Sequence, residues 1–343
     1  MVVLGIETSC DETSAAVLKE NFSVLSNIVL SQDEIHAPFG GVVPELASRQ
    51  HISSIEYVVE ESLNAAGVRL KQVDVFAVTQ GPGLIGSLLV GVSFAKGLAY
   101  YFQKPLIPVD HLESHIHAAF LENRSVAFPA LALLVSGGHT SLFLMKEKLA
   151  YEQIGKTRDD AAGEALDKIA KFLGLGYPGG PVVDRMARDG NARKFLFSLP
   201  RMSDQSLDYS FSGLKTAALR TIKENAIKKN HPLLADFLAS FQKAVVKALI
   251  FNLDLALEAH NPESLILCGG VARNSVLRQN FQRLAEKKGL ASYIPSPEFC
   301  TDNAAMVAGL ALEKFNREKT SSLSLELNAY PTNLKKSGKV KRF

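Results

Sequence analysis

Short apolar runs and longer stretches of helical periodicity follow one another along the first part of the chain. Residues 2–7, VVLGIE, predict a buried strand, and the polar turn TSCDETS separates it from two more predicted strands, AAVL and SVLSNIVL. A predicted helix follows, with apolar residues at helical spacing: Leu46, Ile52, Ile55, Val59 and Leu63. VDVFAVTQGPG then predicts a strand with a glycine-rich turn, SLLVGVSFAKGLAYYF a helix, and PLIPVD a short strand.

The opening pattern returns in PALALLVSGGHTSLFLMKEKLAYEQIG, which again predicts strand, polar turn, strand and strand. The chain is then mainly helical through residues 233–260 and ends in alternating strands and helices: SLILCGG, SVLRQNFQRLAEKKG, ASYIP and NAAMVAGLALEKF. Its 343 residues exceed the size at which one hydrophobic core usually stops growing. We therefore expect an α/β protein with two lobes, built on a repeated unit, and a cleft between them.

Composition and charge indicate an ordinary soluble protein. Hydrophobic residues make up 47% and charged residues 21% of the chain, and the net charge of +3 does not by itself indicate a nucleic-acid partner. The N-terminus lacks a signal-type pattern, and no apolar segment approaches the ~20 residues that span a bilayer. The three cysteines are scattered, so we expect a reducing, cytoplasmic setting without a membrane. The basic C-terminus, KKSGKVKRF, either touches phosphates or is a disordered tail.

Three of the eight histidines lie in one predicted helix, VDHLESHIHAAF. His111 and His115 are four residues apart, so both rings project from one helix face, which is a metal-chelating arrangement. The HExxH pattern of the zinc peptidases is missing. His117 lies off the shared face and is interpreted as a core or surface residue. His139 lies in the second polar turn and is interpreted as orienting that turn.

Three turns, TSCDETS, VSGGHTS and CGGVARNS, each follow a predicted buried strand and could present backbone N–H groups to an anion. Singly, most such turns merely reverse the chain. Their order resembles the sugar kinase, Hsp70 and actin superfamily, which implies a two-lobed actin-like ATPase fold with duplicated RNase H-like lobes and an interlobe cleft. Ser136 stands where that superfamily usually has an acidic residue, so we expect nucleotide binding without ordinary γ-phosphate hydrolysis.

The expected division of the chain follows this fold. We expect an N-terminal lobe over residues 1–110, completed by residues 320–335. The C-terminal lobe, with the metal and nucleotide sites, is expected over residues 111–319. Residues 336–343 form the basic tail.

Five ordered motifs, GIETSCDETSAAV, HLESHIHAAF, LLVSGGHTSL, CGGVARN and CTDNAAMVA, resemble the bacterial tRNA N6-adenosine threonylcarbamoyltransferase family, once named O-sialoglycoprotein endopeptidases. The resemblance runs over nearly all of residues 1–330. It implies transfer of a threonylcarbamoyl group from threonylcarbamoyl-adenylate to N6 of the adenosine 3′ to the anticodon, in tRNAs that read codons beginning with A, with release of AMP. It also implies two protein partners: an inactive paralogue that dimerises through the N-terminal lobe, and a P-loop ATPase.

The resemblance implies a metal site of His111, His115 and Asp302 that holds one divalent ion, iron(II) or alternatively zinc. From the sequence alone, Asp302 reads first as a cap of the helix that follows it, and the resemblance reverses that order. Asp11, in the first polar turn beside Glu12, is the candidate for orienting the attacking amine or accepting its proton.

Substrate contacts carry over by position to one set of residues: Leu134, Val135, Ser136, Gly137, Gly138, Asp167, Gly180, Asp184 and Asn274. Without the resemblance, Asp167 reads as a solvated carboxylate beside Lys168 and Lys171. Gly180 and Asp184 then read as a helix start, and Asn274 as a helix cap. Three other functions remain open: an ATP-hydrolysing member of the superfamily, a metallopeptidase, and a catalytically silent scaffold.

Overall fold

The computed structural model describes residues 1–199, 202, 204–318 and 329–331. The chain divides into two compact units. Unit 1 holds residues 1–32, residues 42–117 and the described residues from 302 onward, and unit 2 holds residues 33–41 and 118–301. The expected tail, residues 336–343, lies outside the described residues, as do residues 320–328 and 332–335 of the segment expected to complete the first lobe.

Unit 1 is built on a five-stranded sheet in the order β3-β2-β1-β4-β5. The first three strands are antiparallel neighbours, whereas β1, β4 and β5 run parallel. The strands are β1 Val2–Glu7, β2 Glu12–Lys19, β3 Val24–Ser31, β4 Val75–Gly81 and β5 Leu106–Asp110. All five were predicted, but β2 begins at Glu12, so the first polar turn is shorter than expected because Glu12, Thr13 and Ser14 pair with β3.

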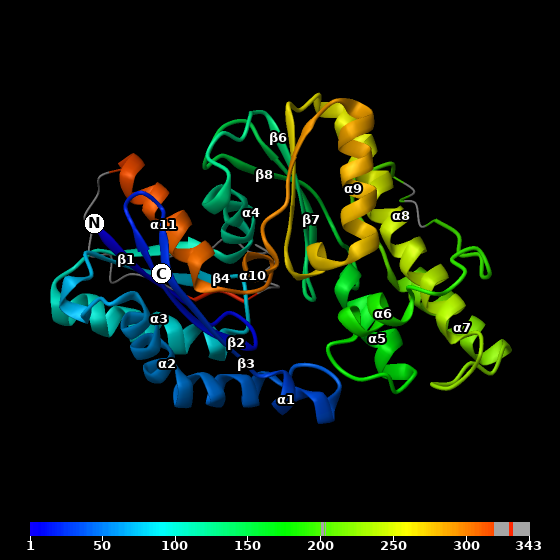
Figure 1. Ribbon diagram of the computed structural model, residues 1–343, viewed down its shortest axis with the longest axis horizontal. Helices are drawn as coiled ribbons and strands as arrows, with labels where there is room; N and C mark the ends of the chain where they lie inside the picture. The colour runs from blue at the N-terminus through cyan, green and yellow to red at the C-terminus, as the bar shows by residue number, and fades with distance from the viewer. Residues whose placement is uncertain (200–201, 203, 319–328, 332–343) are drawn as a thin grey trace, which may run out of the picture. The chain divides into compact units, whose positions relative to one another are not determined.

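The two faces of this sheet pack against different helices (Figure 1). On one face, Leu4 and Ile6 of β1 share a core with the helices α2 (Pro44–Ala66) and α3 (Ile85–Phe102). On the other face lies α11 (Ala304–Glu318), which contacts β1 so closely that a Cβ on Gly5 would lie 2.5 Å from the carbonyl oxygen of Ala304. Alternation along β1 therefore assigns successive residues to opposite helical layers.

The packing of α11 explains why the observed division differs from the expected one. Residues 302–318 belong to unit 1, since α11 covers its sheet, whereas they were expected in the second lobe. Helix α4 (His111–Glu122) is shared: its residues up to His117 belong to unit 1 and the rest to unit 2. The three residues expected to bind metal thus all lie in unit 1.

Helices α2 and α3 also differ from the sequence expectation in detail. Ile52 of α2 is 66% exposed, because the buried face of this helix runs through His51, Ile55 and Val59 instead. Helix α3 is long and apolar enough, by length and composition alone, to cross a membrane, contrary to the expectation that no segment is. Its inner side nevertheless packs into the core of unit 1 through Val92, Ala95 and Ala99.

Unit 2 repeats the sheet of unit 1. Its five strands are ordered β10-β9-β6-β7-β8, with β6, β7 and β8 antiparallel and β6, β9 and β10 parallel. Counted from the first strand of each unit, the order and the directions match those of unit 1, so the predicted duplication is confirmed. The strands are β6 Ala130–Val135, β7 Thr140–Met145, β8 Tyr151–Lys156, β9 Ser264–Cys268 and β10 Ala291–Tyr293.

Helices and short turns complete unit 2 and the connections of unit 1. The helices of unit 2 are α1 Asp33–His36, α5 Ala162–Phe172, α6 Gly179–Met186, α7 Ser212–Glu224, α8 Leu234–His260, α9 Ser275–Lys288 and α10 Pro297–Cys300. The 3-10 turns are η1 Ala37–Phe39, η2 Leu70–Gln72 and η3 Gly270–Arg273. The predicted long helix, residues 233–260, is α8, and its buried face carries Phe237 and Phe241 into the core of unit 2.

Candidate functional site

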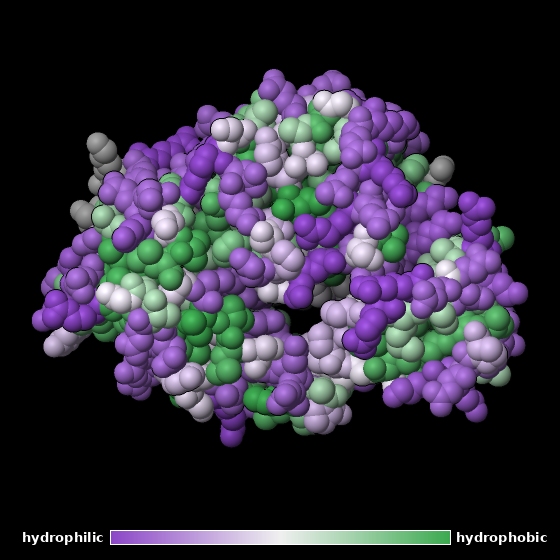
Figure 2. Space-filling view, in the orientation of Figure 1, coloured by the Kyte–Doolittle hydropathy of each residue, from purple (hydrophilic) through white to green (hydrophobic). Residues whose placement is uncertain are grey.

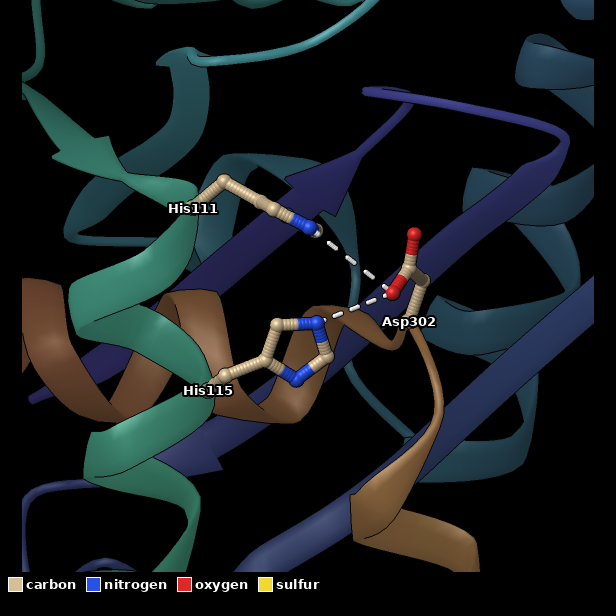
Figure 3. Close-up of side chains that lie close together, drawn as sticks. All are labelled: His111, His115 and Asp302. Carbon is tan, nitrogen blue, oxygen red and sulfur yellow. Dashed lines mark hydrogen bonds and ion pairs between the residues drawn. The ribbon is translucent and has the colours of Figure 1, made fainter. Parts of the chain in front are cut away.

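His111, His115 and Asp302 form one cluster in unit 1, in which the candidate ligand atoms all lie within 4.8 Å of one another (Figure 3). The Nε2 atom of His115 lies 3.0 Å from Oδ1 of Asp302, and the Nε2 atom of His111 lies 3.8 Å from the same oxygen. Both histidines are buried, and Asp302 is partly buried. Two imidazoles and a carboxylate converging in this way can hold a divalent transition metal.

The local structure of α4 fixes where the two rings point. Strand β5 ends at Asp110, whose Oδ1 accepts hydrogen bonds from the backbone N–H groups of Leu112 (2.8 Å) and Glu113 (3.1 Å). The helix therefore begins directly after the strand, with His111 in its first turn and His115 one turn on. His117 is fully buried in the same helix and does not belong to the group of candidate ligands formed by His111, His115 and Asp302.

Asp302 and its neighbour Asn303 divide two roles that the sequence left open. The Oδ1 atom of Asn303 accepts a hydrogen bond from the backbone N–H of Met306, 3.1 Å away, and so caps the first turn of α11. The carboxylate of Asp302 faces the two histidines (Figure 3). The helix-capping interpretation therefore belongs to Asn303.

Glu7, which the sequence reasoning missed, lies behind His111. Its fully buried carboxylate accepts hydrogen bonds from the Thr79 hydroxyl (2.6 Å) and the Ser9 backbone N–H (2.5 Å), and its Oε2 lies 3.3 Å from Nδ1 of His111. A carboxylate at Nδ1 favours the tautomer that leaves Nε2 for a metal. The signal was available: Glu7 is the one charged residue at the end of an otherwise apolar first strand.

The charges of this cluster are strongly coupled. Burial alone would lower the pKa of His111, but the nearby carboxylates of Asp302 and Glu7 outweigh it and raise that pKa to about 9. Burial would likewise raise the pKa of Glu7, but the attraction of His111 brings it below its usual value. Without a metal, His111 therefore holds a proton between two carboxylates at neutral pH.

Asp11 lies in the same unit, in the turn between β1 and β2. Its side chain is largely buried, and its backbone carbonyl accepts a hydrogen bond from the N–H of Gln32. The turn itself approaches the metal cluster, since the Ser9 hydroxyl lies 3.1 Å from Nδ1 of His111. The role of Asp11 in proton transfer stays a prediction.

In unit 2, the residues expected to contact substrate gather around two neighbouring turns. Strands β6 and β9 run parallel with Leu134 opposite Cys268, so the turns that follow them leave the same edge of the sheet. Leu134 and Val135 are fully buried, which leaves only their backbone for a ligand. Ser136 closes its turn by accepting, through its hydroxyl, a hydrogen bond from the N–H of His139.

This turn has open space beside its glycines. A Cβ built on Gly137 or Gly138 would meet no atom of the described chain within 4 Å. Their N–H groups can therefore be approached closely by an anion. The turn is closed through the backbone of His139, which accepts from the N–H of Ser136 and donates to its hydroxyl, and an orienting role for the His139 side chain stays a prediction.

Asp167 connects α5 to the start of α6. Its Oδ1 accepts hydrogen bonds from the backbone N–H groups of Gly179 (2.7 Å) and Gly180 (3.0 Å). Lys168, the neighbour named in the alternative interpretation of Asp167 as a solvated carboxylate, pairs with Asp160 and Glu164. Asp167 thus holds the first turn of α6, whose last turns carry Asp184.

Asp184 and Asn274 meet through Gln242, a residue that the sequence reasoning also missed. The buried Gln242 donates from Nε2 to Oδ1 of Asp184 (2.8 Å) and lies 3.4 Å from Oδ1 of Asn274. Asn274 caps α9 by accepting from Leu277 N–H, so the capping role foreseen for it is observed. Ser275 donates its hydroxyl to Asp184 as well. The sequence pattern did not predict a role for Gln242, because a polar residue on a long helix ordinarily faces solvent.

Two units with the same mixed five-stranded sheet define the class of α/β proteins that share the actin-like ATPase fold, as predicted. Solved structures agree at the level of the fold. The Acidaminococcus fermentans (R)-2-hydroxyglutaryl-CoA dehydratase component A matches with a TM-score of 0.54 at 17% identity, over 92% of this chain and 98% of that one. Full-length HypF matches with a TM-score of 0.59 at 14% identity, over 93% of this chain and 56% of that one.

The family follows from the sequence relatives. Residues 23–309 match the TsaD family, described as tRNA N6-adenosine threonylcarbamoyltransferase. A protein of that name from Clostridium perfringens is 48% identical over 96% of this chain and 97% of its own length. One from Geotalea uraniireducens is 52% identical over 90% of each chain. The chain belongs to the tRNA N6-adenosine threonylcarbamoyltransferase family, and the resemblance inferred from the five motifs is confirmed.

Proposed function

We propose that this chain transfers a threonylcarbamoyl group from threonylcarbamoyl-adenylate to N6 of the adenosine 3′ to the anticodon, in tRNAs that read codons beginning with A. The observation that carries the proposal is family membership over almost the whole chain, at about half identity to transferases of that name. The N6–carbonyl bond forms, the carbonyl–phosphate bond breaks, AMP leaves, and N6 loses one proton. We place this reaction in the cytoplasm.

The reaction calls for positioning more than for a covalent nucleophile. The lone pair of an exocyclic adenine amine is delocalised into the ring, so the amine attacks only a highly activated acyl donor. A mixed anhydride with phosphate is such a donor. The protein's part is to hold the carbonyl carbon beside N6 and to stabilise the charge that develops on the carbonyl oxygen.

His111, His115 and Asp302 fit a divalent ion, because three donor atoms of suitable chemistry already converge and the Glu7 carboxylate supports one of the rings. The donor set suits iron(II) and also admits zinc. When bound, the ion supplies a Lewis acid and a template for the oxygens of the threonylcarbamoyl group. Glu7 keeps Nε2 of His111 directed at the site, and Asp11 accepts or relays the proton that N6 loses.

The residues of unit 2 take the adenylate part of the donor. The Ser136–Gly138 turn offers backbone N–H groups and open space to the phosphate. Leu134 and Val135 contribute backbone groups only. Gly180, held by Asp167, and Asp184 take the ribose, and Asn274 faces the adenine. The hydrogen bonds that Asp184 and Asn274 make to Gln242 support this assignment, because they fix both side chains beforehand.

The partners proposed for the chain are tRNA, an inactive paralogue and a P-loop ATPase. The paralogue would dock on unit 1, where α2 and α3 expose large apolar side chains: Ile52, Tyr57, Leu89, Tyr100 and Tyr101. Figure 2 shows apolar side chains reaching the surface of unit 1 in the region of its sheet and of these two helices. Large exposed apolar patches mark interaction sites, and this exposure is what favours unit 1 as the docking face.

A single-turnover assay tests the proposed function. Unmodified tRNA, pre-made threonylcarbamoyl-adenylate, the purified chain and its partner proteins are mixed, and the digested tRNA is analysed by nucleoside mass spectrometry. We expect threonylcarbamoyl-adenosine next to the anticodon and one AMP per modification, with His111→Ala folded but inactive. If active partners are verified and no modified adenosine forms, the proposal is wrong.

A further inference from the structure

The described residues 329–331 lie against the sheet of unit 1, beyond the end of α11. The backbone N–H of Tyr330 donates to the carbonyl of Gln80 (3.0 Å), and Pro331 forms a parallel bridge with Gly83. Tyr330 approaches the end of β4 so closely that a Cβ on Gly81 would lie 2.5 Å from the Tyr330 carbonyl oxygen. Gly81 also has a φ of +149°, a conformation that L-residues rarely adopt. This end of β4 is therefore shaped to receive the later segment.

The side chain of Tyr330 reaches the residue that starts the histidine helix. Its hydroxyl donates to Oδ2 of Asp110 over 2.5 Å, between residues 220 positions apart. The other oxygen of Asp110 accepts from Leu112 and Glu113 and so caps the first turn of α4. Burial, and then the charge of Asp110, raise the pKa of Tyr330, so its hydroxyl remains a donor across the physiological range.

We propose that Tyr330 is a positioning residue for the metal site, acting through Asp110 on the helix that carries His111 and His115. The Asp110 carboxylate is held at both oxygens, by two backbone N–H groups at Oδ1 and by the Tyr330 hydroxyl at Oδ2. Its orientation is therefore fixed, and that orientation sets the direction of the first turn of α4. His111 belongs to that turn, and His115 follows on the same face. The inference rests on the proposed metal site of the transferase.

The expected size of the effect of Tyr330 on metal affinity follows from how metal sites respond to the groups that support their ligands. Partners that orient a ligand typically change metal affinity by about 10–100-fold. Tyr330 acts one residue further out than such a partner, so we expect the lower end of that range. The effect concerns affinity for the ion, which can be measured without tRNA or the adenylate.

The test uses Tyr330→Phe, which keeps the ring and removes the hydroxyl. Metal-free full-length protein is titrated with Zn²⁺ against a chromogenic chelator, and with Co²⁺ by its absorption bands. We expect the dissociation constant for Zn²⁺ to rise by about 10-fold. Tyr293→Phe is the matched control, because the Tyr293 hydroxyl also donates a hydrogen bond, to the carbonyl oxygen of Ser125, but lies in unit 2. We expect that variant to bind like wild type.

A second variant separates orientation from general stability. In an Asp110→Asn background the hydrogen bond from Tyr330 loses its charged acceptor, so adding Tyr330→Phe should change Zn²⁺ affinity far less than it does in wild type. The melting temperature of each metal-free variant is recorded, and binding is measured well below it. The inference is overturned if Tyr330→Phe binds Zn²⁺ within twofold of wild type, or if its effect is undiminished beside Asp110→Asn. A wild-type chain that binds no Zn²⁺ or Co²⁺ would overturn it as well, while the mass-spectrometric assay judges the transfer reaction separately.

Discussion

Glu7 and His111 are 104 positions apart in the chain, yet Oε2 of the glutamate lies 3.3 Å from Nδ1 of the histidine. The contact joins the end of the first strand to the first turn of the histidine helix. Because Nδ1 faces a carboxylate, Nε2 is the nitrogen left for a ligand. Glu7 and the neighbouring Ser9 therefore connect the first polar turn of the chain directly to the candidate metal site of unit 1.

Replacing Glu7 by Gln should weaken metal binding while leaving the three ligands in place. The amide keeps the shape of the carboxylate but loses its charge and can donate to Nδ1, which favours the wrong tautomer. We expect a loss of about 10–100-fold in affinity for Zn²⁺, measured by chelator competition. Glu20→Gln, at an exposed site of the same unit, is the control and should bind normally. Wild-type affinity in Glu7→Gln would show that Glu7 serves only the fold.

Asp302 and Asn303 are adjacent but have different roles, as a proposed metal ligand and as a helix cap, so substitutions at the two positions should have different effects. Asp302→Ala should lose metal, as should His111→Ala and His115→Ala, since each removes a proposed ligand. Asn303→Ala should keep the metal but lose about 1 kcal/mol of stability, because it removes the cap of α11. Elemental analysis and chemical unfolding of the same samples measure both effects. The assignment fails if Asp302→Ala retains a full complement of metal.

The charge state of His111 predicts how the metal-free protein responds to pH. A histidine whose pKa is raised from 6.5 to about 9 on folding contributes stability that is fully present below pH 6.5 and is lost as the pH rises through about 9. We therefore expect the free energy of unfolding, measured by urea titration with a chelator present, to fall across that window. In His111→Asn the fall should be much smaller. An equal fall in both proteins would assign the pH dependence to other groups.

Much of the fold could be predicted because its signals are local. Strand periodicity located the described strands, and the return of one pattern after residue 129 predicted the duplicated sheet. The division into units could not be read in the same way. Helix α11 belongs to unit 1 because Gly5 lets it lie on β1, a contact between residues about 300 positions apart that no local pattern records.

The residues of the candidate site also fall into those that local sequence patterns predicted and those that they did not. His111, His115 and Asp302 were foreseen from spacing and family motifs, and the structure brings them together. Glu7, Gln242 and Tyr330 were not, because each acts on a side chain far away in the sequence. Asn303 was overlooked for another reason: from the sequence alone, the capping role was assigned to its neighbour Asp302, although asparagine caps a helix as well as aspartate does.

Gln242 gives the last prediction, which concerns the adenylate end of the reaction. Its Nε2 holds Asp184 at 2.8 Å and lies 3.4 Å from Oδ1 of Asn274, so it sets two side chains that we assign to ribose and adenine. Gln242→Ala should therefore weaken the binding of AMP or ATP, measured by calorimetry, by roughly 5–10-fold, as expected for losing about 1 kcal/mol of hydrogen bonding.

The control is the next residue, Lys243, which is exposed on α8, and Lys243→Ala should bind like wild type. Because Gln242 is buried, its truncation also destabilises unit 2, so affinity is measured well below the melting temperature of each variant. Asn274→Asp keeps an oxygen for the helix cap while losing the amide donor, and it should weaken nucleotide binding. The assignment requires that Gln242→Ala and Asn274→Asp both bind nucleotide more weakly than wild type while Lys243→Ala binds it normally. Unchanged nucleotide affinity in both variants would place the nucleotide away from Gln242, Asp184 and Asn274.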